Sequence, residues 1–195
     1  MLSLNVYNWD SAEQISLAAI ADRFPQLEEL WVGGEPLPLG ELNALSGMKN
    51  LRRLRLGLDQ VTAGNESDEL RLPPCLETLF LQAFPLDRLP GLVEALHRTP
   101  SVTQLGLHAV GLDPSHGEVL SQLHWIEELG LENNLGLTGE IIGSLAEIES
   151  LRGLGLNGTS IHTPWQEIFQ EIPQLQSLYA WGVPRDRHDL EGEVE

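Results

Sequence analysis

The chain of 195 residues contains a single cysteine, Cys75. One thiol cannot form an intrachain disulfide, which excludes a small disulfide-stapled scaffold and fits a reducing compartment. We expect Cys75 itself to be a small, half-buried apolar residue. The sequence has no run of about 18 apolar residues, so no membrane-spanning helix is predicted. Its first twenty residues include acidic side chains but no basic one, so no signal peptide is expected, and the predicted location is cytoplasmic.

Basic residues are scarce as well. Eleven Lys and Arg stand against 29 Asp and Glu, which gives a formal net charge of -18. Nucleic acids and anionic membranes are bound through cationic side chains, so this balance argues against both as partners. It favours a basic protein partner, although acidity also serves plain solubility.

The sequence also lacks the patterns of catalytic, metal and cofactor sites. It has no G-x-S-x-G, H-E-x-x-H or phosphate-loop motif. His108, His116 and His124 are eight residues apart, which matches no metal-ligand spacing. The segment 153–158 reads G-x-G-x-x-G, but its leucines fall at predicted strand positions, where a dinucleotide loop does not fit. We therefore predict a non-enzymatic protein without cofactor or metal.

What the sequence does contain is a repeat of the form apolar-x-x-apolar-x-apolar. Eight copies are spaced 24 to 26 residues apart, and they begin at Met1, Leu27, Leu51, Leu76, Val102, Ile126, Leu151 and Leu175. Apolar residues two apart, such as Leu54 and Leu56, lie on one face of a short strand. Because more than ten residues separate successive strands, the strands should pair in parallel.

Several crossovers between the strands carry helix signals. Ser11 with Gln14 forms a capping box, and Pro114 and Pro164 suit the first position of a helix. Helices are therefore expected at 12–24, 91–98, 115–124, 140–149 and 165–171. The segment from Thr62 to Cys75 has no helical period, which predicts an extended loop.

This repeat resembles the leucine-rich repeat family, whose pattern is L-x-x-L-x-L-x-x-N/C-x-L. The resemblance covers residues 1–183, and "NNLGLTGEI" is similar to the plant-type subclass with one residue inserted. It implies an α/β solenoid, a curved horseshoe with a parallel sheet on the concave face and short helices and loops on the convex face. Only Asn134 fills the asparagine position, so the ladder of side-chain amides should be incomplete. The acidic residues 184–195 are expected to form a disordered tail.

The family binds proteins with the exposed face of its sheet, so the side chains predicted there are the candidate site. They are Trp31, Arg55, Phe80, Gly106, Gly130, Gly155 and Tyr179 at one position of the repeat, and His108, Glu132, Asn157 and Trp181 two residues further on. Exposed aromatic side chains are typical interface anchors, although aromatics near the ends can instead cover the core. The three glycines suggest a space for a partner, walled by His108, Glu132 and Asn157 with Glu128 nearby, and this polar wall suits a Lys or Arg of a basic partner. The alternative is sequence drift on a face where nothing packs.

Charged residues alternate in sign along neighbouring predicted strands, as in Glu28, Arg52 and Glu77, in Glu29 and Arg53, and in Glu127 and Arg152. We interpret them as a surface charge ladder rather than as a binding site. Arg55 differs, because it is predicted to lie between Trp31 and Phe80, where its guanidinium can stack. The predicted function is protein binding through the concave face, most specifically inhibition of a basic protein by an immunity-type protein. The alternative is a recognition or scaffold domain of a larger receptor or bacterial effector.

Overall fold

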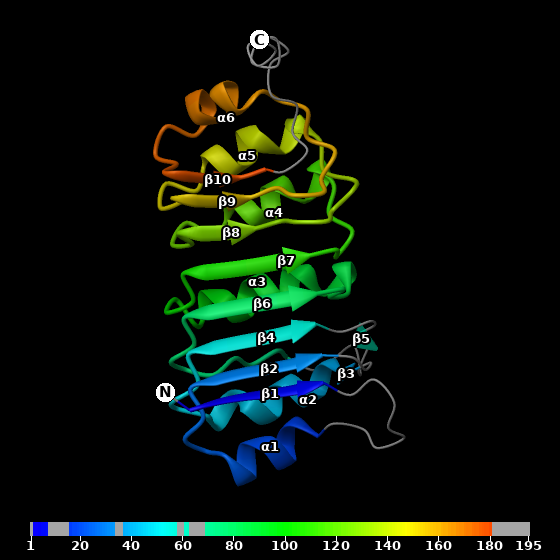
Figure 1. Ribbon diagram of the computed structural model, residues 1–195, viewed down its shortest axis with the longest axis vertical. Coiled ribbons are helices and arrows are strands. Elements are labelled where there is room, and N and C mark those ends of the chain that lie inside the picture. The colour runs from blue at the N-terminus through cyan, green and yellow to red at the C-terminus, as the bar shows by residue number, and fades with distance from the viewer. Residues whose placement is uncertain (1, 8–15, 34–36, 58–60, 63–68, 181–195) are drawn as a thin grey trace, which may run out of the picture.

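The computed structural model describes residues 2–7, 16–33, 37–57, 61–62 and 69–180. Its main feature is an open, eight-stranded parallel sheet, to which each copy of the repeat contributes one strand (Figure 1). The strands follow chain order: β1 (Ser3–Tyr7), β2 (Glu29–Gly33), β4 (Arg53–Gly57), β6 (Thr78–Gln82), β7 (Gln104–His108), β8 (Glu128–Gly130), β9 (Gly153–Gly155) and β10 (Ser177–Tyr179). The predicted parallel sheet is confirmed.

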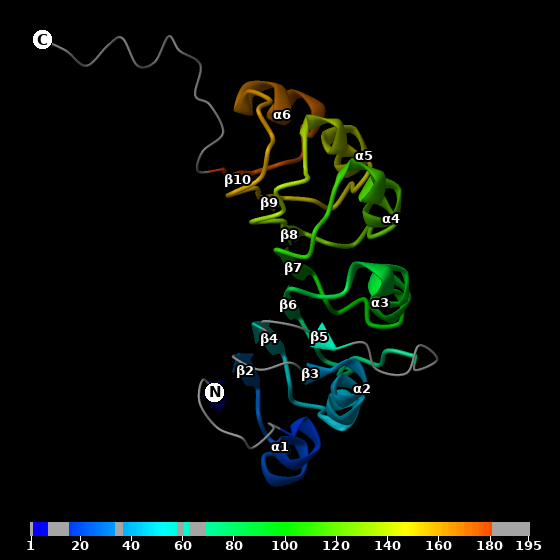
Figure 2. The ribbon, with the colours of Figure 1, turned by 90° about the vertical axis from the view of Figure 1, so that its right-hand side faces the viewer.

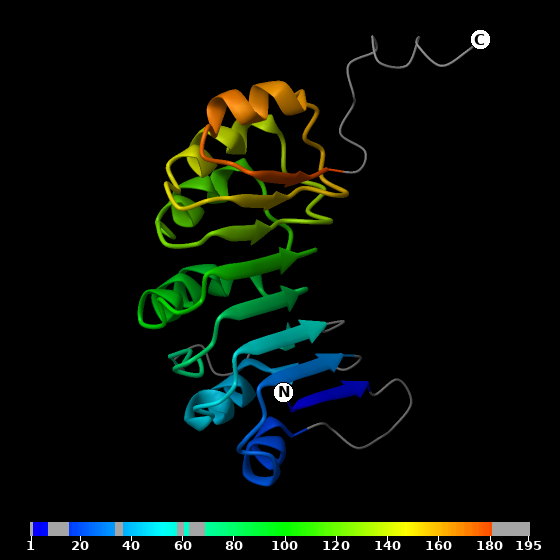
Figure 3. The same ribbon diagram turned by 60° about the vertical axis from the view of Figure 1, so that its left-hand side comes forward.

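Short helices cover one side of this sheet, and the strands line the concave side of a gently curved solenoid (Figures 2 and 3). The α-helices are α1 (Leu17–Arg23), α2 (Leu39–Leu42), α3 (Leu89–His97), α4 (Gly117–Ser121), α5 (Ile142–Ala146) and α6 (Trp165–Glu171). The 3-10 turns are η1 (Asn43–Gly47), η2 (Leu86–Arg88), η3 (Pro114–His116) and η4 (Gly139–Ile141). Most of these helices lie where the sequence predicts them, but α2 and η1 occupy a crossover for which no helix was expected.

The residues that cap the helices differ slightly from those expected. Helix α1 starts at Leu17, after Ser16, whose hydroxyl accepts the Ala19 N–H at 3.3 Å; the predicted box of Ser11 and Gln14 lies outside the described residues. Pro164 is the residue before α6 rather than its first residue. Asp113 caps η3 with the expected proline following it, but His116 completes the capping box in place of Glu or Gln.

The crossovers that follow β2 and β4 form a second, two-stranded parallel sheet. It joins β3 (Leu37–Pro38) to β5 (Val61–Thr62). Two residues per strand give no readable period, so the sequence analysis did not predict this pair. Of the loop expected over 62–75, Thr62 instead belongs to β5 and residues 63–68 lie outside the described residues, while residues 69–75 form no helix or strand and end in a turn. Cys75 is exposed, which corrects the expectation of a half-buried residue, since it stands in that turn.

The core lies between the sheet and the helices and is built from the three apolar positions of each copy. In the copy that begins at Leu51, for example, Leu51, Leu54 and Leu56 are all fully buried. The alternation of β4, with its arginines exposed and its leucines buried, is the period-two pattern of a strand with one solvent face. The side chains between the leucines therefore face the concave side.

Asn134 is buried in this core and bonds to the backbone of two repeats. Its Oδ1 accepts the N–H groups of Val110, Gly111 and Leu112 at 3.0, 3.0 and 3.1 Å. Its Nδ2 donates to the carbonyls of Leu107 and Leu131, both at 2.8 Å. One side chain thus satisfies backbone groups that the turn after β7 would otherwise leave unpaired.

The turns after four successive strands share one unusual backbone conformation. Positive φ angles occur at Ala83 (55°), Ala109 (50°), Asn133 (61°) and Gly158 (70°), which stand at the same position of their repeats. Only glycine and, less well, asparagine adopt this left-handed region readily. The two alanines are therefore held there by the repeat geometry around them.

Candidate functional site

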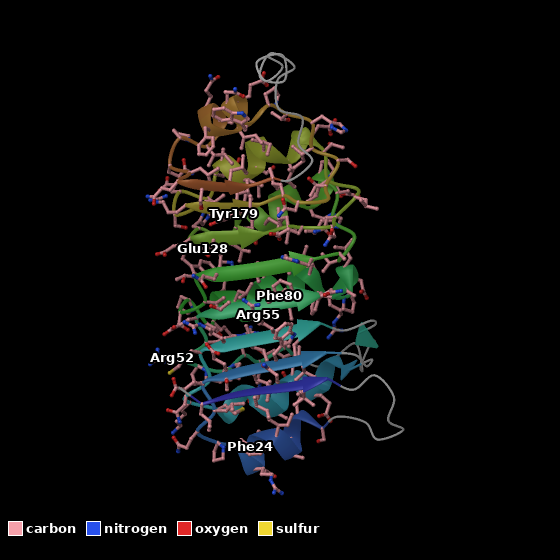
Figure 4. The ribbon with its side chains drawn as sticks, viewed as in Figure 1. Phe24, Arg52, Arg55, Phe80, Glu128 and Tyr179 are labelled. Carbon is pink, nitrogen blue, oxygen red and sulfur yellow. The ribbon has the colours of Figure 1, made fainter. Side chains whose placement is uncertain are left out.

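The strand register aligns the candidate residues across the concave face. Trp31 pairs with Arg55, and Arg55 pairs with Phe80. The same line continues through Gly106, Gly130 and Gly155 to Tyr179. The predicted alignment of these seven residues is confirmed, and Figure 4 looks onto this face, with Arg55, Phe80 and Tyr179 labelled.

The first half of this line is a stack of side chains. The Arg55 guanidinium carbon lies 5.8 Å from the centroid of the Trp31 ring and 5.8 Å from that of Phe80. Phe80 in turn packs on the His108 ring, with centroids 4.1 Å apart and planes tilted by 58°. A cation between two aromatic faces is stabilised by both rings, as the sequence predicted for Arg55.

His108 continues the stack to the next strand, because its Nε2 pairs with Oε2 of Glu132. Both side chains are largely buried, at 20% and 19% exposure. Burial alone would raise the pKa of Glu132. Hydrogen bonding to His108 and to its own backbone, together with the charge of His108, outweighs burial and holds the pKa of Glu132 below its ordinary value of 4.5.

The three glycines of the line do not form the open floor that the sequence suggested. A β-carbon at Gly106 would lie 2.7 Å from Cδ2 of Phe80. At Gly130 it would lie 2.7 Å from Oε2 of Glu132 and 3.0 Å from Nε2 of His108, and at Gly155 it would meet Oε1 of Glu132. His108 and Glu132 were expected to wall an empty space, but together with Phe80 they lie over the glycines. The glycine line is therefore not an empty floor: the Phe80 ring takes the space over Gly106, and the flexible ends of Glu132 and His108 take the space over the other two glycines.

A hollow of about 280 Å³ nevertheless remains between Phe80 and Tyr179, over β6 to β10. Its lining includes Arg55, Phe80 and His108 toward the N-terminal end and Glu128, Glu132 and Tyr179 toward the C-terminal end. Nothing in the described part of the chain forms an ion pair or hydrogen bond with the Glu128 carboxylate, and Figure 4 shows this residue at the start of β8. Tyr179 is 60% exposed at the far side.

The charge ladder on the neighbouring positions is confirmed in its N-terminal half. Arg52 pairs with Glu77, and Arg53 pairs with Glu29. Arg152 does not continue the ladder, because it donates to the backbone carbonyls of Glu149 and Leu151. Exposed pairs of this kind contribute less than about 1 kcal/mol each, so they fix the register of the strands more than their stability.

Two further candidates stand apart from the hollow. Asn157 does not line it, and its backbone carbonyl accepts the N–H of Asn133 at 2.7 Å. The expected wall of His108, Glu132 and Asn157 is therefore wrong in its third member. Trp181 lies outside the described residues, as does the tail 184–195.

Two polar residues of the hollow, Thr78 and Gln104, were not predicted from the sequence, and Glu128, which was expected only near the polar wall, also lines the hollow. They are aligned by the register two residues before the glycine line, and the Thr78 hydroxyl donates to Oε1 of Gln104 at 2.8 Å. Their place on the concave face could have been predicted from the sequence, because side chains two residues apart on a strand share a face.

No group of three or more His, Cys, Asp or Glu among the described residues is placed to hold a metal ion. None of the helices in the same ranges is long and apolar enough to span a membrane. The G-x-G-x-x-G segment begins with strand β9 itself, in which Leu154 is fully buried.

The architecture follows from eight parallel strands in register, one for each copy of the repeat, and from the short helices on the convex side. The fold is a leucine-rich repeat solenoid of the α/β class. No known protein-family model matches the sequence, and no curated protein does. Among solved structures, the chain is similar to an internalin from Listeria monocytogenes, with 18% identity and a TM-score of 0.44. The alignment covers 91% of this chain and 46% of the internalin, so the chain spans less than half the length of that protein.

Proposed function

We propose that this solenoid is a non-enzymatic protein-binding module that acts through its concave face. The observation that carries the proposal is the hollow between Phe80 and Tyr179. It is lined by the exposed ring of Tyr179 and by the carboxylate of Glu128, which has no partner among the described residues. Aromatic residues on a rigid sheet lose little conformational freedom on binding, which makes them effective anchors. Trp31, 37% exposed at the other end of the stack, offers a second anchor.

The distribution of charge supports a basic partner. Residues 102–180 contain ten Asp and Glu and a single Arg, a net charge of -9, whereas residues 1–101 contain 14 acidic and eight basic residues, a net charge of -6. The C-terminal half of the solenoid therefore carries nearly unopposed negative charge. Such a field attracts a positively charged protein and speeds its association.

The sharper form of the proposal is that the chain neutralises a basic protein, as an immunity or inhibitor protein does. The same concave face would serve a recognition domain of a larger receptor or effector. In the inhibitor form we place the protein in the cytoplasm, where a lone exposed thiol such as Cys75 stays reduced.

An affinity capture with three purified baits tests the proposal. The baits are the wild type, a concave variant (Trp31→Ser with Tyr179→Ser) and a convex control, Trp165→Ser, whose ring is 44% exposed on α6. A protein retained by the wild type is then purified and titrated against all three. We expect the concave variant to bind at least about tenfold more weakly and the convex control to bind like the wild type. Equal binding by all three, loss only in the convex control, or no protein retained would overturn the proposal.

A further inference from the structure

The central line of the concave face changes character halfway along the sheet. From β2 to β6 it reads aromatic, cation, aromatic, because Arg55 lies between the rings of Trp31 and Phe80. From β7 to β9 it holds only glycines, and at β10 it ends in another aromatic residue, Tyr179. The second half thus has an aromatic ring at each end, as the first half has, but no cation of its own in between.

The room for such a cation follows from the strand spacing. Adjacent strands lie about 4.8 Å apart, so the backbone at Phe80 and that at Tyr179, four strands apart, are separated by about 19 Å. Phe80 leans toward this gap and takes the space over Gly106. At the next two strand positions, the Glu132 carboxylate lies over Gly130 and Gly155, and Nε2 of His108 also lies over Gly130, so these side chains form part of the lining of the hollow between the stack and Tyr179.

Two carboxylates border this remaining gap, both from the segment that starts with β8. Oε1 of Glu132 lies over Gly155, and Cγ of Glu128 lies 3.2 Å from where a β-carbon of Gly153 would be. Because Oε2 of Glu132 also lies 2.7 Å from where a β-carbon of Gly130 would be, the Glu132 carboxylate lies over the central line, between Gly130 and Gly155, whereas Glu128 stands two residues before that line. The Oε2 atom of Glu132 pairs with His108, whereas the Glu128 carboxylate has no partner among the described residues. The hollow therefore has the Glu132 carboxylate over its glycine line, the Glu128 carboxylate to one side of that line and the ring of Tyr179 at its far end.

We propose that this gap receives the guanidinium of an arginine side chain from the partner protein, which completes the row of alternating rings and cations. The inference rests on the proposed function and specifies its partner. A guanidinium is planar, stacks on aromatic rings and donates in fixed directions to two carboxylates. A lysine ammonium is a compact, strongly hydrated point charge that neither stacks flat on the ring of Tyr179 nor donates in fixed directions to two carboxylates.

The experiment uses N-acetyl-arginine amide as the probe, with its lysine and citrulline counterparts as comparisons. Citrulline has nearly the shape of arginine without its charge. Each probe is titrated into the full chain, and the backbone amide resonances of Gly130, Gly153 and Gly155 are followed by NMR. We expect saturable shifts with arginine, binding about threefold weaker with lysine, and no saturable shift with citrulline. Equal shifts with all three probes, or none with arginine, would overturn the arginine site.

Two variants locate the probe within the hollow. Glu128→Gln removes one carboxylate of the gap and should weaken arginine binding about fivefold, the value of an exposed charge pair. Glu127→Gln makes the same charge change one residue away, at an exposed side chain that does not line the hollow, and should leave binding unchanged. An equal loss in both variants would show that the probe senses only net charge and would refute the site.

The same pair of variants separates this inference from the proposed function. A captured partner that loses affinity in the concave variant and in Glu128→Gln, but not in Glu127→Gln, supports both. A partner that needs Trp31 and Tyr179 but binds Glu128→Gln like the wild type leaves the concave interface standing and contradicts the arginine site. If the arginine probe binds as expected but the partner binds the concave variant as tightly as the wild type, the proposed function fails and the arginine does not come from that partner.

Discussion

The ring of Phe80 occupies the space over Gly106 on the neighbouring strand, so that a β-carbon at residue 106 would lie 2.7 Å from Cδ2 of that ring. This contact explains the glycine at residue 106, the first of the three aligned on β7, β8 and β9. Any side chain there would push Phe80 off its position between Arg55 and His108.

Gly106→Ala is therefore expected to destabilise the fold by about 1 to 2 kcal/mol, because the displaced ring loses its contacts on both sides. The same change in a Phe80→Ala background should be neutral or slightly stabilising, because alanine is better than glycine in a strand by about 0.5–1 kcal/mol. Urea unfolding of the four proteins measures the coupling. Equal effects of Gly106→Ala in both backgrounds would show that Phe80 does not require the glycine.

At the two alanines with positive φ in the turns, replacement by glycine is expected to stabilise the fold. At Ala83 and Ala109, φ is 55° and 50°, so glycine removes a conformational cost of about 1 kcal/mol at each position. Ala83→Gly and Ala109→Gly should each raise the free energy of unfolding. Ala18→Gly, at an exposed position of α1, is the control and should lower it, since glycine weakens a helix. Destabilisation by all three substitutions would contradict the backbone assignment of the turns.

Much of the fold follows from the sequence because the repeat fixes it. The spacing of Leu54 and Leu56 sets which face of a strand is buried, and the repeat length sets the parallel register that places Arg55 between Trp31 and Phe80. The direction in which a side chain leans is not periodic. The sequence therefore does not show that Phe80, His108 and Glu132 lie over the glycines. The same holds for the two-residue strands β3 and β5, which are too short to carry a pattern.

Asn134 is expected to be among the most sensitive polar residues of the core. Asn134→Ala leaves the N–H groups of Val110, Gly111 and Leu112 without their acceptor and should cost about 3 kcal/mol. Asn50 also donates across one repeat, to Pro25 and Gln26, but at the surface, so Asn50→Ala should cost less than about 0.5 kcal/mol. Denaturant midpoints of the two variants compare them directly. Similar small losses in both would mean that water replaces the bonds of Asn134.

Glu132 should make the stability depend on acid pH. Its pKa in the folded state lies below the ordinary 4.5, so its stabilising contribution is complete above pH 4.5 and is lost as the pH falls through the folded-state pKa. In Glu132→Gln that contribution is missing at every pH. The stability difference between wild type and variant should thus shrink as the pH is lowered below 4.5, as measured by urea unfolding at several pH values between 5 and 2. A difference that grows on acidification would mean that the pKa of Glu132 is raised instead.

The most direct test of the concave interface is site-specific photo-crosslinking in cells of the source organism. A benzophenone amino acid replaces Tyr179 on the concave face or Trp165 on the convex helix α6, two rings that are both exposed. The account predicts that position 179 forms a covalent adduct with one basic protein, that the crosslinked segment of that protein contains an arginine, and that position 165 forms no such adduct. An adduct with the same protein from position 165 and none from position 179 would contradict it.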